Sequence, residues 1–558
     1  MASRDSGTVR PTKRKHVFFA AAVLLLVCVL AAGAVSAVKV SNFQELQAAI
    51  TSADGDTTIV VADNISIGAD DAIPAITKNI LLTTTAGENH RIYRTAENTS
   101  YQNGMFTIQS GGNLTIQGNN SQMFTHTLTL DGNKTALPEN GQTLVWVKEG
   151  GYFTLGNGGV LTNNNVTGQS ASGTEQKNSG GVYVLGGTFT MNGGEISNNT
   201  VGNSGGGVYV LGGTFTMKGG KISNNTVINN GGGVCVNNGT FTMFGGTISD
   251  NKAHNGGGVF VCDLVECVCG TFTMSGGTIS GNTATDLGGG VYIDHFGMFV
   301  IAHTAQISEN GAKNGGGVYV LPDGTFSLFG GEISGNKADG TGGGNDTGNG
   351  GGVYVMKGGD VTMSGGTISG NTAKGTGSGS NTGNGGGVYV DDQGSTFTMS
   401  GGTISENRAD GNGDGVYVGG TFNVDTTGTA DSVYLPQGRV ITVIQQQFTG
   451  KISGIVSENR NIGTRIVSFN SPVQGSSEDR EYFQLDETLT ELSLGLTYDA
   501  DEDILKLAQT YTVSFQAYDG TPVPEDQTVT HGDPVDEPKT LTKDGNKFDG
   551  WHKDTACT

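Results

Sequence analysis

Basic residues and cysteine are both scarce in this sequence. Its 558 residues include 30 lysines and arginines against 52 aspartates and glutamates, which gives a net charge of −22. Binding to nucleic acid needs clustered lysine and arginine, so the composition argues against a nucleic-acid partner. Six cysteines are too few for a disulfide scaffold in a chain of this length. The excess of acidic residues is typical of a soluble exterior surface.

Three of the cysteines, Cys262, Cys267 and Cys269, lie close together in the segment VCDLVECVCG. Their spacing contains no CxxC pair, and no second cluster completes a set of metal ligands. A metal site, a local disulfide and free thiols all remain open, and the spacing favours the last two. We therefore expect no metal and no cofactor.

Long apolar runs are also absent, with one exception at the start of the chain. Five basic residues precede position 16, and no charged residue follows from Val17 to Val38. The run ends in AGAVSA, with small residues at Val35 and Ala37, as a signal peptidase requires. We predict a signal peptide over 1–37, cleaved after Ala37, and export to the cell surface, envelope or medium. An uncleaved membrane anchor is the alternative, because 22 uncharged residues can span a bilayer.

Glycine, in contrast, is abundant and periodic. A phrase whose fullest form is GGGVYVLGGTFTMKGGKISNNT, residues 205–226, returns nine times within residues 179–420. The first valine of successive copies recurs at spacings of 25 to 35 residues. Self-similarity at such a period is the signature of a solenoid.

Each copy holds three short segments in which apolar residues alternate with others, separated by glycine or asparagine corners. The outer valines of VYV, the Phe and Met of TFTM, and the Ile of TIS or EIS are expected to face inward. Three strands in about 26 residues make one coil. The predicted fold is all-β: a right-handed parallel β-helix followed by a small β-grasp-like module.

An asparagine follows each of these isoleucines by three residues. Asparagine tolerates left-handed turn geometry, and stacked asparagines can form an amide ladder. We assign this structural role to Asn199, Asn225, Asn251, Asn282, Asn310, Asn336, Asn371 and Asn407.

The residue between the two valines of VYV is expected to face outward, and it is aromatic in eight copies. An exposed aromatic stripe at coil spacing would offer a platform for sugar rings. The alternative is that the rings stack on one another and stabilise the sheet. The column consists of Tyr183, Tyr209, Phe260, Tyr292, Tyr319, Tyr354, Tyr389 and Tyr417, with Cys235 in the remaining copy.

The segments on either side of the array are less regular. Within 38–178, Ser41 and Gln44 resemble a capping box, and Phe43, Leu46 and Ile50 share one helical face. A short helix there, ending near residues 54–55, would cover the open end of the solenoid. This helix followed by a GDT turn and an apolar strand resembles the start of pectate-lyase-like β-helices. Irregular coils should continue from the helix into the array, and residues 421–508 should form closing coils.

The tail, 509–558, lacks the repeated phrase and contains other motifs. Its YTVSF strand, TPVP bend, HGDPV turn and GNKFDGWHKD segment resemble the Listeria–Bacteroides repeat, the B repeat of internalins, across residues 511–558. Here Tyr518-Asp519-Gly520 replaces the usual Asn-Gly-Gly-like turn, and the final strand of the family is expected beyond Thr558. The resemblance implies a β-grasp-like module of bacterial surface proteins.

The array itself resembles the repeats of chlamydial polymorphic outer-membrane proteins, in which GGA precedes an aliphatic residue and FxxN follows. In this sequence GGGVYV and I-S-x-N stand in those places, with Gly for Ala and Ile for Phe. The broader class, adhesin-like β-helix proteins of bacteria, covers about residues 38–508.

Two functions follow from these patterns. The first is a non-enzymatic surface or secreted protein, an adhesin or stalk, with glycans or host and matrix surfaces as partners. The second is a polysaccharide lyase or hydrolase, which would need paired carboxylates or calcium ligands with a base. Asp391-Asp392 and Asp294-His295 are the candidates, and each stands alone in sequence. We therefore predict no catalytic residues.

Overall fold

The computed structural model describes residues 37–95, 104–121, 124–137, 142–167, 178–262, 270–340, 347–375, 381–392, 394–445, 448–515, 525–531 and 533–536. The predicted signal peptide, Cys267, Cys269 and most of the tail lie outside these residues, as does most of the expected β-grasp-like module. Across the described ranges, no helix has the length and apolarity needed to cross a membrane.

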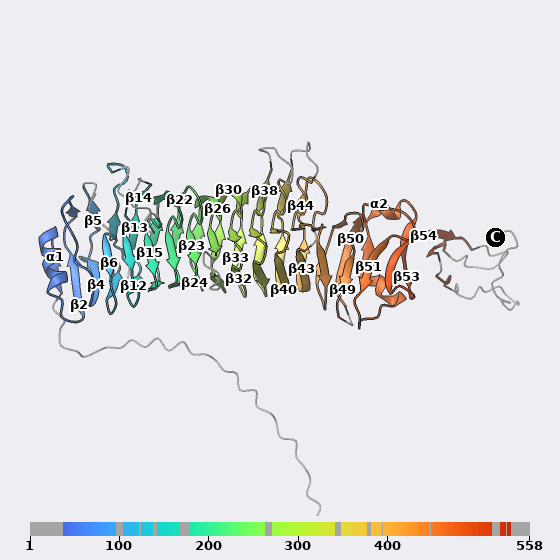
Figure 1. Ribbon diagram of the computed structural model, residues 1–558, viewed down its shortest axis with the longest axis horizontal. Helices are drawn as coiled ribbons and strands as arrows, with labels where there is room; N and C mark the ends of the chain where they lie inside the picture. Colours follow the sequence, from blue (N-terminus) through green and yellow to red (C-terminus); the bar gives the residue numbers. More distant parts are fainter. Residues whose placement is uncertain are drawn as a thin grey trace, which may run out of the picture. The chain divides into compact units, whose positions relative to one another are not determined.

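Each copy of the repeated phrase forms one coil, and the coils stack in sequence order (Figure 1). In the fullest copy the strands are β19 (Val208–Leu211), β20 (Thr214–Met217), β21 (Lys221–Ser223) and β22 (Thr226–Val227). The coil therefore has four strands, and the expected number of three was wrong. The fourth strand is only two residues long here, which is too short to show an alternating pattern in the sequence.

Corresponding strands of successive coils pair in parallel, forming four columns of short strands. The VYV column contains β6 (Phe106–Ile108), β11 (Val145–Val147), β15 (Val182–Leu185), β19, β23 (Val234–Asn237), β27 (Val259–Cys262), β31 (Val291–Ile293), β35 (Val318–Val320), β39 (Val353–Val355), β42 (Val388–Val390), β45 (Val416–Val418) and β48 (Val433–Leu435). The TFTM column contains β4 (Asn79–Thr84), β7 (Asn113–Ile116), β12 (Tyr152–Leu155), β16 (Thr188–Met191), β20, β24 (Thr240–Met243), β28 (Thr271–Met274), β32 (Met298–Ile301), β36 (Thr325–Leu328), β40 (Asp360–Ser369), β43 (Thr396–Ser405), β46 (Thr421–Val424) and β49 (Ile441–Val443).

The third column holds the isoleucines, and β40 and β43 extend into it. It contains β13 (Gly159–Thr162), β17 (Glu195–Ser197), β21, β25 (Thr247–Ser249), β29 (Thr278–Ser280), β33 (Gln306–Ser308), β37 (Glu332–Ser334) and β47 (Thr429–Ala430). The fourth contains β14 (Asn165–Val166), β18 (Thr200–Val201), β22, β26 (Lys252–Asn255), β30 (Thr283–Leu287), β34 (Gly311–Ala312), β38 (Lys337–Asp339), β41 (Thr372–Lys374) and β44 (Arg408–Ala409). These all-parallel stacked sheets have the arrangement of a parallel β-solenoid.

One continuous hydrophobic core fills the coils. The outer valines of VYV, the Phe and Met of TFTM, and the isoleucines are buried, as the alternation predicts. Equivalent phenylalanines of successive coils stack face to face, with ring centroids 4.7 Å apart for Phe189 and Phe215 and 4.5 Å for Phe241 and Phe272. Burial of large side chains in each coil supplies the main driving force for stacking.

A short helix begins the stack. After β1 (Val38–Val40) comes α1 (Phe43–Thr51), which buries Phe43, Leu46 and Ile50 as predicted. Its N-cap is Asn42, whose side chain accepts from the Glu45 backbone N–H at 3.0 Å, so the expected capping residue Ser41 was wrong by one position. The irregular coils then comprise β2 (Thr57–Val61), β3 (Ile65–Ile67), β4, β5 (His90–Arg94), β8 (Asn120–Ser121), β9 (Phe124–Thr125) and β10 (Leu128–Asp131).

The pairing changes at the other end of the stack. Parallel pairing persists through β50 (Lys451–Ser457), β51 (Arg465–Phe469) and β52 (Phe483–Leu485). The 3-10 helix η1 (Ser477–Tyr482) and helix α2 (Glu487–Thr490) flank β52. The strands β53 (Leu494–Asp499), β54 (Ile504–Val513) and β55 (Gln527–Thr530) then pair antiparallel.

Candidate binding surfaces

The eight predicted asparagines form a buried ladder along the inner corner of the coils. In each step the side-chain Oδ1 of one asparagine accepts from the backbone N–H and the Nδ2 of its predecessor. Asn251 N and Nδ2, for example, lie 3.0 and 2.9 Å from Asn282 Oδ1. The Nδ2 group also donates to an isoleucine carbonyl of the preceding coil, as Asn282 does to Ile248 at 2.9 Å. The side chains of this ladder are thereby occupied by one another and are not offered to a ligand.

The ladder begins one coil earlier than the sequence analysis placed it, at Asn164. The backbone N–H of Asn164 donates to Asn199 Oδ1 at 3.1 Å, and the Nη1 of buried Arg94 donates to Asn164 Oδ1 at 3.2 Å. Arg94 also donates to the carbonyls of Gln142 and Thr143. Burial lowers the pKa of this guanidinium to about 10.

A second asparagine row, which the sequence analysis missed, lies just before the glycines of GGGVYV. Backbone N–H groups of Asn349, Asn384 and Asn412 donate to the Oδ1 of the preceding member, at 3.0, 2.8 and 2.7 Å. Asn314 is the first member of this row. The signal was present, because an asparagine precedes the glycines at each of these four positions.

The aromatic column is buried, so the prediction of an exposed stripe was wrong. The exposed fraction is between 1% and 6% for Tyr183, Tyr209, Phe260, Tyr292, Tyr319, Tyr354 and Tyr389, while Tyr417 is partly buried. The rings stack on their neighbours, with centroids 4.6 Å apart for Tyr319 and Tyr354 and 4.9 Å apart for Tyr389 and Tyr417. This is the arrangement that the alternative interpretation described.

The reason lies in what covers the outer side of the VYV strands. Leu185, Leu211 and Leu287 pack against the rings and form a second apolar cluster with them. The glycine segment ahead of each strand also comes close: a Cβ at Gly205, where φ is +69°, would lie 2.8 Å from the Cβ of Tyr209. Burial raises the pKa of Tyr417 to about 12, and it raises the pKa of the other tyrosines of the column for which a shift is resolved.

The two cysteines that the structure describes lie in the same cluster. Cys235 and Cys262 are buried free thiols, and burial raises the pKa of Cys235. Among the described residues, no three histidine, cysteine or acidic side chains are grouped so as to hold a metal ion.

The two candidate catalytic positions, Asp294 and Asp391, occupy the corner after VYV in different coils. Asp294 and Asp391 are three coil steps apart, with Leu321 and Met356 between them. At about 4.8 Å per coil this separates them by roughly 14 Å. The two carboxylates of glycosidases lie about 5–9.5 Å apart, so this pair does not match. Asp392 pairs with Arg439 at 3.3 Å, and His295 Nδ1 contacts the Pro322 carbonyl at 2.9 Å.

From β7 to β28 the outward residues of the TFTM column form an uncharged, hydroxyl-rich face that the sequence analysis did not single out. The alternation that buries Phe and Met sends the two threonines of each strand outward. One register line runs through Thr115, Thr154, Thr190, Thr216, Thr242 and Thr273.

A groove of about 530 Å³ lies at the N-terminal end of this threonine face. It is situated over β4, β7 and β12 and the corner that follows them. Its lining consists of Thr83, Thr115, Gln117, Gly118, Asn119, Thr154, Gly156, Asn157 and Asn192. No residue in this lining carries a charge.

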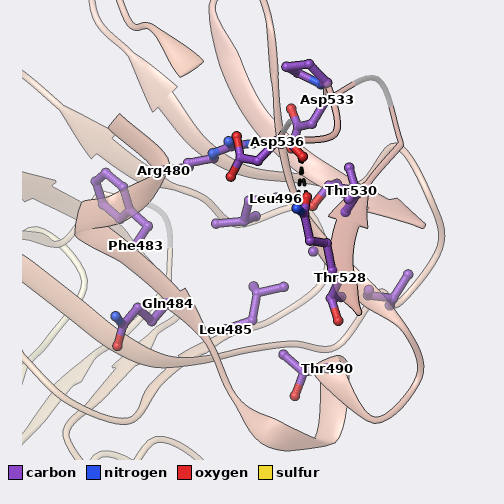
Figure 2. A pocket seen from close by; sticks show the side chains of 15 residues that line it. Arg480, Phe483, Gln484, Leu485, Thr490, Leu496, Thr528, Thr530, Asp533 and Asp536 are labelled. Carbon is purple, nitrogen blue, oxygen red and sulfur yellow. Dashed lines mark hydrogen bonds and ion pairs between the residues drawn. The ribbon is translucent and has the colours of Figure 1, made fainter. Parts of the chain in front are cut away.

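A larger pocket of about 700 Å³ lies between β52–β53 and β55. Figure 2 shows Arg480, Asp533 and Asp536 at one side of it and Gln484, Leu485 and Thr490 at the other. Arg480 forms an ion pair with Asp533, and Gln527 exchanges two hydrogen bonds with the backbone of Asp536, at 2.9 and 3.0 Å. The side chains of Arg480, Asp533 and Gln527 are therefore paired within the pocket.

The fold and these surfaces define a parallel β-solenoid that carries asparagine and aromatic ladders. Comparison with protein families adds one match: residues 511–558 are similar to the Listeria-Bacteroides repeat domain, as the tail motifs predicted. The antiparallel strand β55 lies within the matched segment. Repeats of this kind occur in bacterial surface proteins. No curated protein and no solved structure matches the chain.

Proposed function

We propose that this chain is a non-enzymatic protein of the bacterial cell surface that serves as an adhesin or stalk. The observation that carries the proposal is the Listeria-Bacteroides repeat at residues 511–558. The stacked coils support it, because their buried asparagines are bonded to one another from coil to coil. Such an arrangement suits a rigid stalk better than an enzyme. Glycans and host or matrix surfaces are the proposed partners.

Exposure on intact cells tests the first part of this proposal. Antibodies raised against the folded solenoid should label unpermeabilised cells of the bacterium that makes the protein, and protease treatment of whole cells should remove the label. A cytoplasmic protein of the same bacterium serves as the control for lysis. Labelling that appears only after permeabilisation would overturn the proposal.

Adhesion tests the second part. The purified chain, coated on beads, should retain polysaccharide or host-matrix preparations above beads coated with an unrelated acidic protein. The alternative, a polysaccharide lyase or hydrolase, predicts release of reducing or unsaturated ends from pectin, polygalacturonate or other glycans. Clear turnover in that screen would replace the adhesin proposal with the enzymatic one.

A further inference from the structure

We propose that the groove at the N-terminal end of the threonine face binds a segment of a neutral polysaccharide. This inference rests on the proposed surface function and adds a ligand class and a place to it.

The first argument is charge. The chain as a whole carries 52 acidic and 30 basic residues, yet the lining of the groove has none of either. An anionic ligand would find no lysine or arginine there, and a cation would find no carboxylate. Because removing a charged ligand from water without a partner is unfavourable, the groove selects an uncharged one.

The second argument is unused hydrogen-bonding capacity. The side-chain amides of Gln117, Asn157 and Asn192 line the groove and make no hydrogen bond to the part of the chain that the structure describes. Each amide offers a carbonyl acceptor and an NH₂ donor. In the buried ladder, by contrast, the amide of Asn282 is fully used.

Threonine hydroxyls complete this surface. Thr115 and Thr154 are adjacent in the register of β7 and β12, and both line the groove. A hydroxyl both donates and accepts, as the amides together do. A sugar ring presents closely spaced hydroxyls that also donate and accept. The groove and the sugar can therefore exchange hydrogen bonds in both directions.

The third argument is an exposed aromatic ring on the same face. Tyr152 begins β12, two residues before Thr154, and is 53% exposed. Residues two apart on a strand project from one face about 7 Å apart. Sugar-binding sites need a flat apolar surface for the ring face beside polar groups for its edge. The buried aromatic column does not supply this surface, but Tyr152 does.

The dimensions suit a segment of a longer chain. The groove volume of about 530 Å³ falls within the roughly 300–1,000 Å³ of small-ligand sites. Beyond its end the register line continues through Thr190, Thr216 and Thr242. A polymer lying along the stack would meet a hydroxyl at each of these coils.

Calorimetric titration of the purified chain tests the inference. The probes are soluble β-glucan, mannan and chitin oligosaccharides as neutral glycans, and polygalacturonate as an acidic one. We expect a neutral glycan to bind and polygalacturonate not to bind. Combining Gln117→Glu with Asn157→Asp preserves side-chain shape but removes two donor groups and adds charge. This double variant should weaken binding about tenfold or more, equivalent to about 1.4 kcal/mol.

The matched control is Asn423→Asp, which makes the same chemical change on the same face of β46 at the far end of the stack. It should bind as the unchanged chain does. Tyr152→Ala provides a second variant that introduces no charge, and it should also weaken binding. Unchanged melting temperatures would show that all the variants fold.

Three outcomes would overturn the inference: no neutral glycan binds, polygalacturonate binds better, or the groove variants bind like the control. If the protein self-associates as its concentration rises, and the double variant does not, the groove would instead bind a second copy of the chain. If the chain is exposed on cells and adheres but the groove variants adhere equally well, the surface function stands and this site is wrong.

Discussion

Removing one asparagine from the middle of the buried ladder should be costly. Asn282 is fully buried, and its Oδ1 accepts from both the backbone N–H and the Nδ2 of Asn251. Its own Nδ2 donates to Ile248 O and Asn310 Oδ1, at 2.9 Å each. Asn282→Ala deletes all four hydrogen bonds at once.

The four bonds do not cost the same. Asn310 Oδ1 keeps the bond from the backbone N–H of residue 282, and Asn251 Nδ2 keeps its bond to Ile222 O. The Asn251 backbone N–H loses its acceptor, and the Ile248 carbonyl loses this donor. The Ile248 carbonyl lies in β25, which also pairs with β29, so the Asn251 backbone N–H is the group left without a partner. Such a group costs about 1–3 kcal/mol, and the lost bond to Ile248 adds about 1 kcal/mol, which gives a loss of about 3 kcal/mol.

Stability in a repeat protein is distributed over coils, so the assay should resolve them. Hydrogen exchange followed by mass spectrometry should show faster exchange in peptides that cover residues 248–251 and 279–284, with smaller changes in distant coils. Asn229→Ala is the control: this asparagine is exposed, and its Nδ2 makes one bond, to Asn203 Oδ1 at 3.2 Å. The control should change stability by less than about 0.5 kcal/mol. Equal effects of the two substitutions would refute the reasoning.

Three further predictions follow from the buried columns. Tyr354→Ser removes a buried ring that stacks on Tyr319 and contacts Tyr389 at a tilt, and it should cost about 3 kcal/mol in denaturant titrations. Glycan affinity should stay unchanged, whereas an exposed aromatic platform would lose affinity. Arg94→Met leaves Asn164 Oδ1 without its donor, whereas the carbonyls of Gln142 and Thr143 keep bonds from Asn164 Nδ2 and the Met105 backbone N–H. It should lower the free energy of unfolding by about 2 kcal/mol. Lysine should not restore the loss, because one ammonium cannot replace the planar fork. Burial raises the pKa of Cys235, so at pH 8 iodoacetamide should label it only on unfolding. The unfolded thiol loses its proton above about pH 8.5 while the folded one retains it, so stability should fall as pH rises past that value, and Cys235→Ala should remove this part of the pH dependence.

Much of the coil was predictable because the same residue types recur at the same positions in successive copies. The alternation of Phe and Met with Thr identifies the core side of the strand in every copy, and the fixed distance from each isoleucine to its asparagine identifies the ladder. A period of two assigns a residue to one side of a strand but says nothing of what packs on that side. Tyr209 therefore seemed exposed, although Leu211 and the glycine segment cover it.

The groove was hidden from sequence reasoning for a different reason. Most of its lining comes from coils that precede the regular array, where Gln117 and Asn157 lie in segments without the repeated phrase. Their proximity arises only from the stacking of β7 on β12, and no periodicity connects them. The two-residue strand Thr200–Val201 escaped notice because two positions cannot display a pattern.

The hydrogen bonds between successive asparagines of the ladder all run in one direction along the chain, and this makes the coils interchangeable. Each internal coil presents a carboxamide oxygen to the coil before it and an amide donor to the coil after it. The coils that begin near Val182 and Val208 are nearly identical in sequence and join their neighbours through the same contacts. Unequal recombination between such copies would add or remove whole coils without leaving a mismatched junction. The stack can therefore vary in length between strains in steps of one coil, while its two ends stay unchanged.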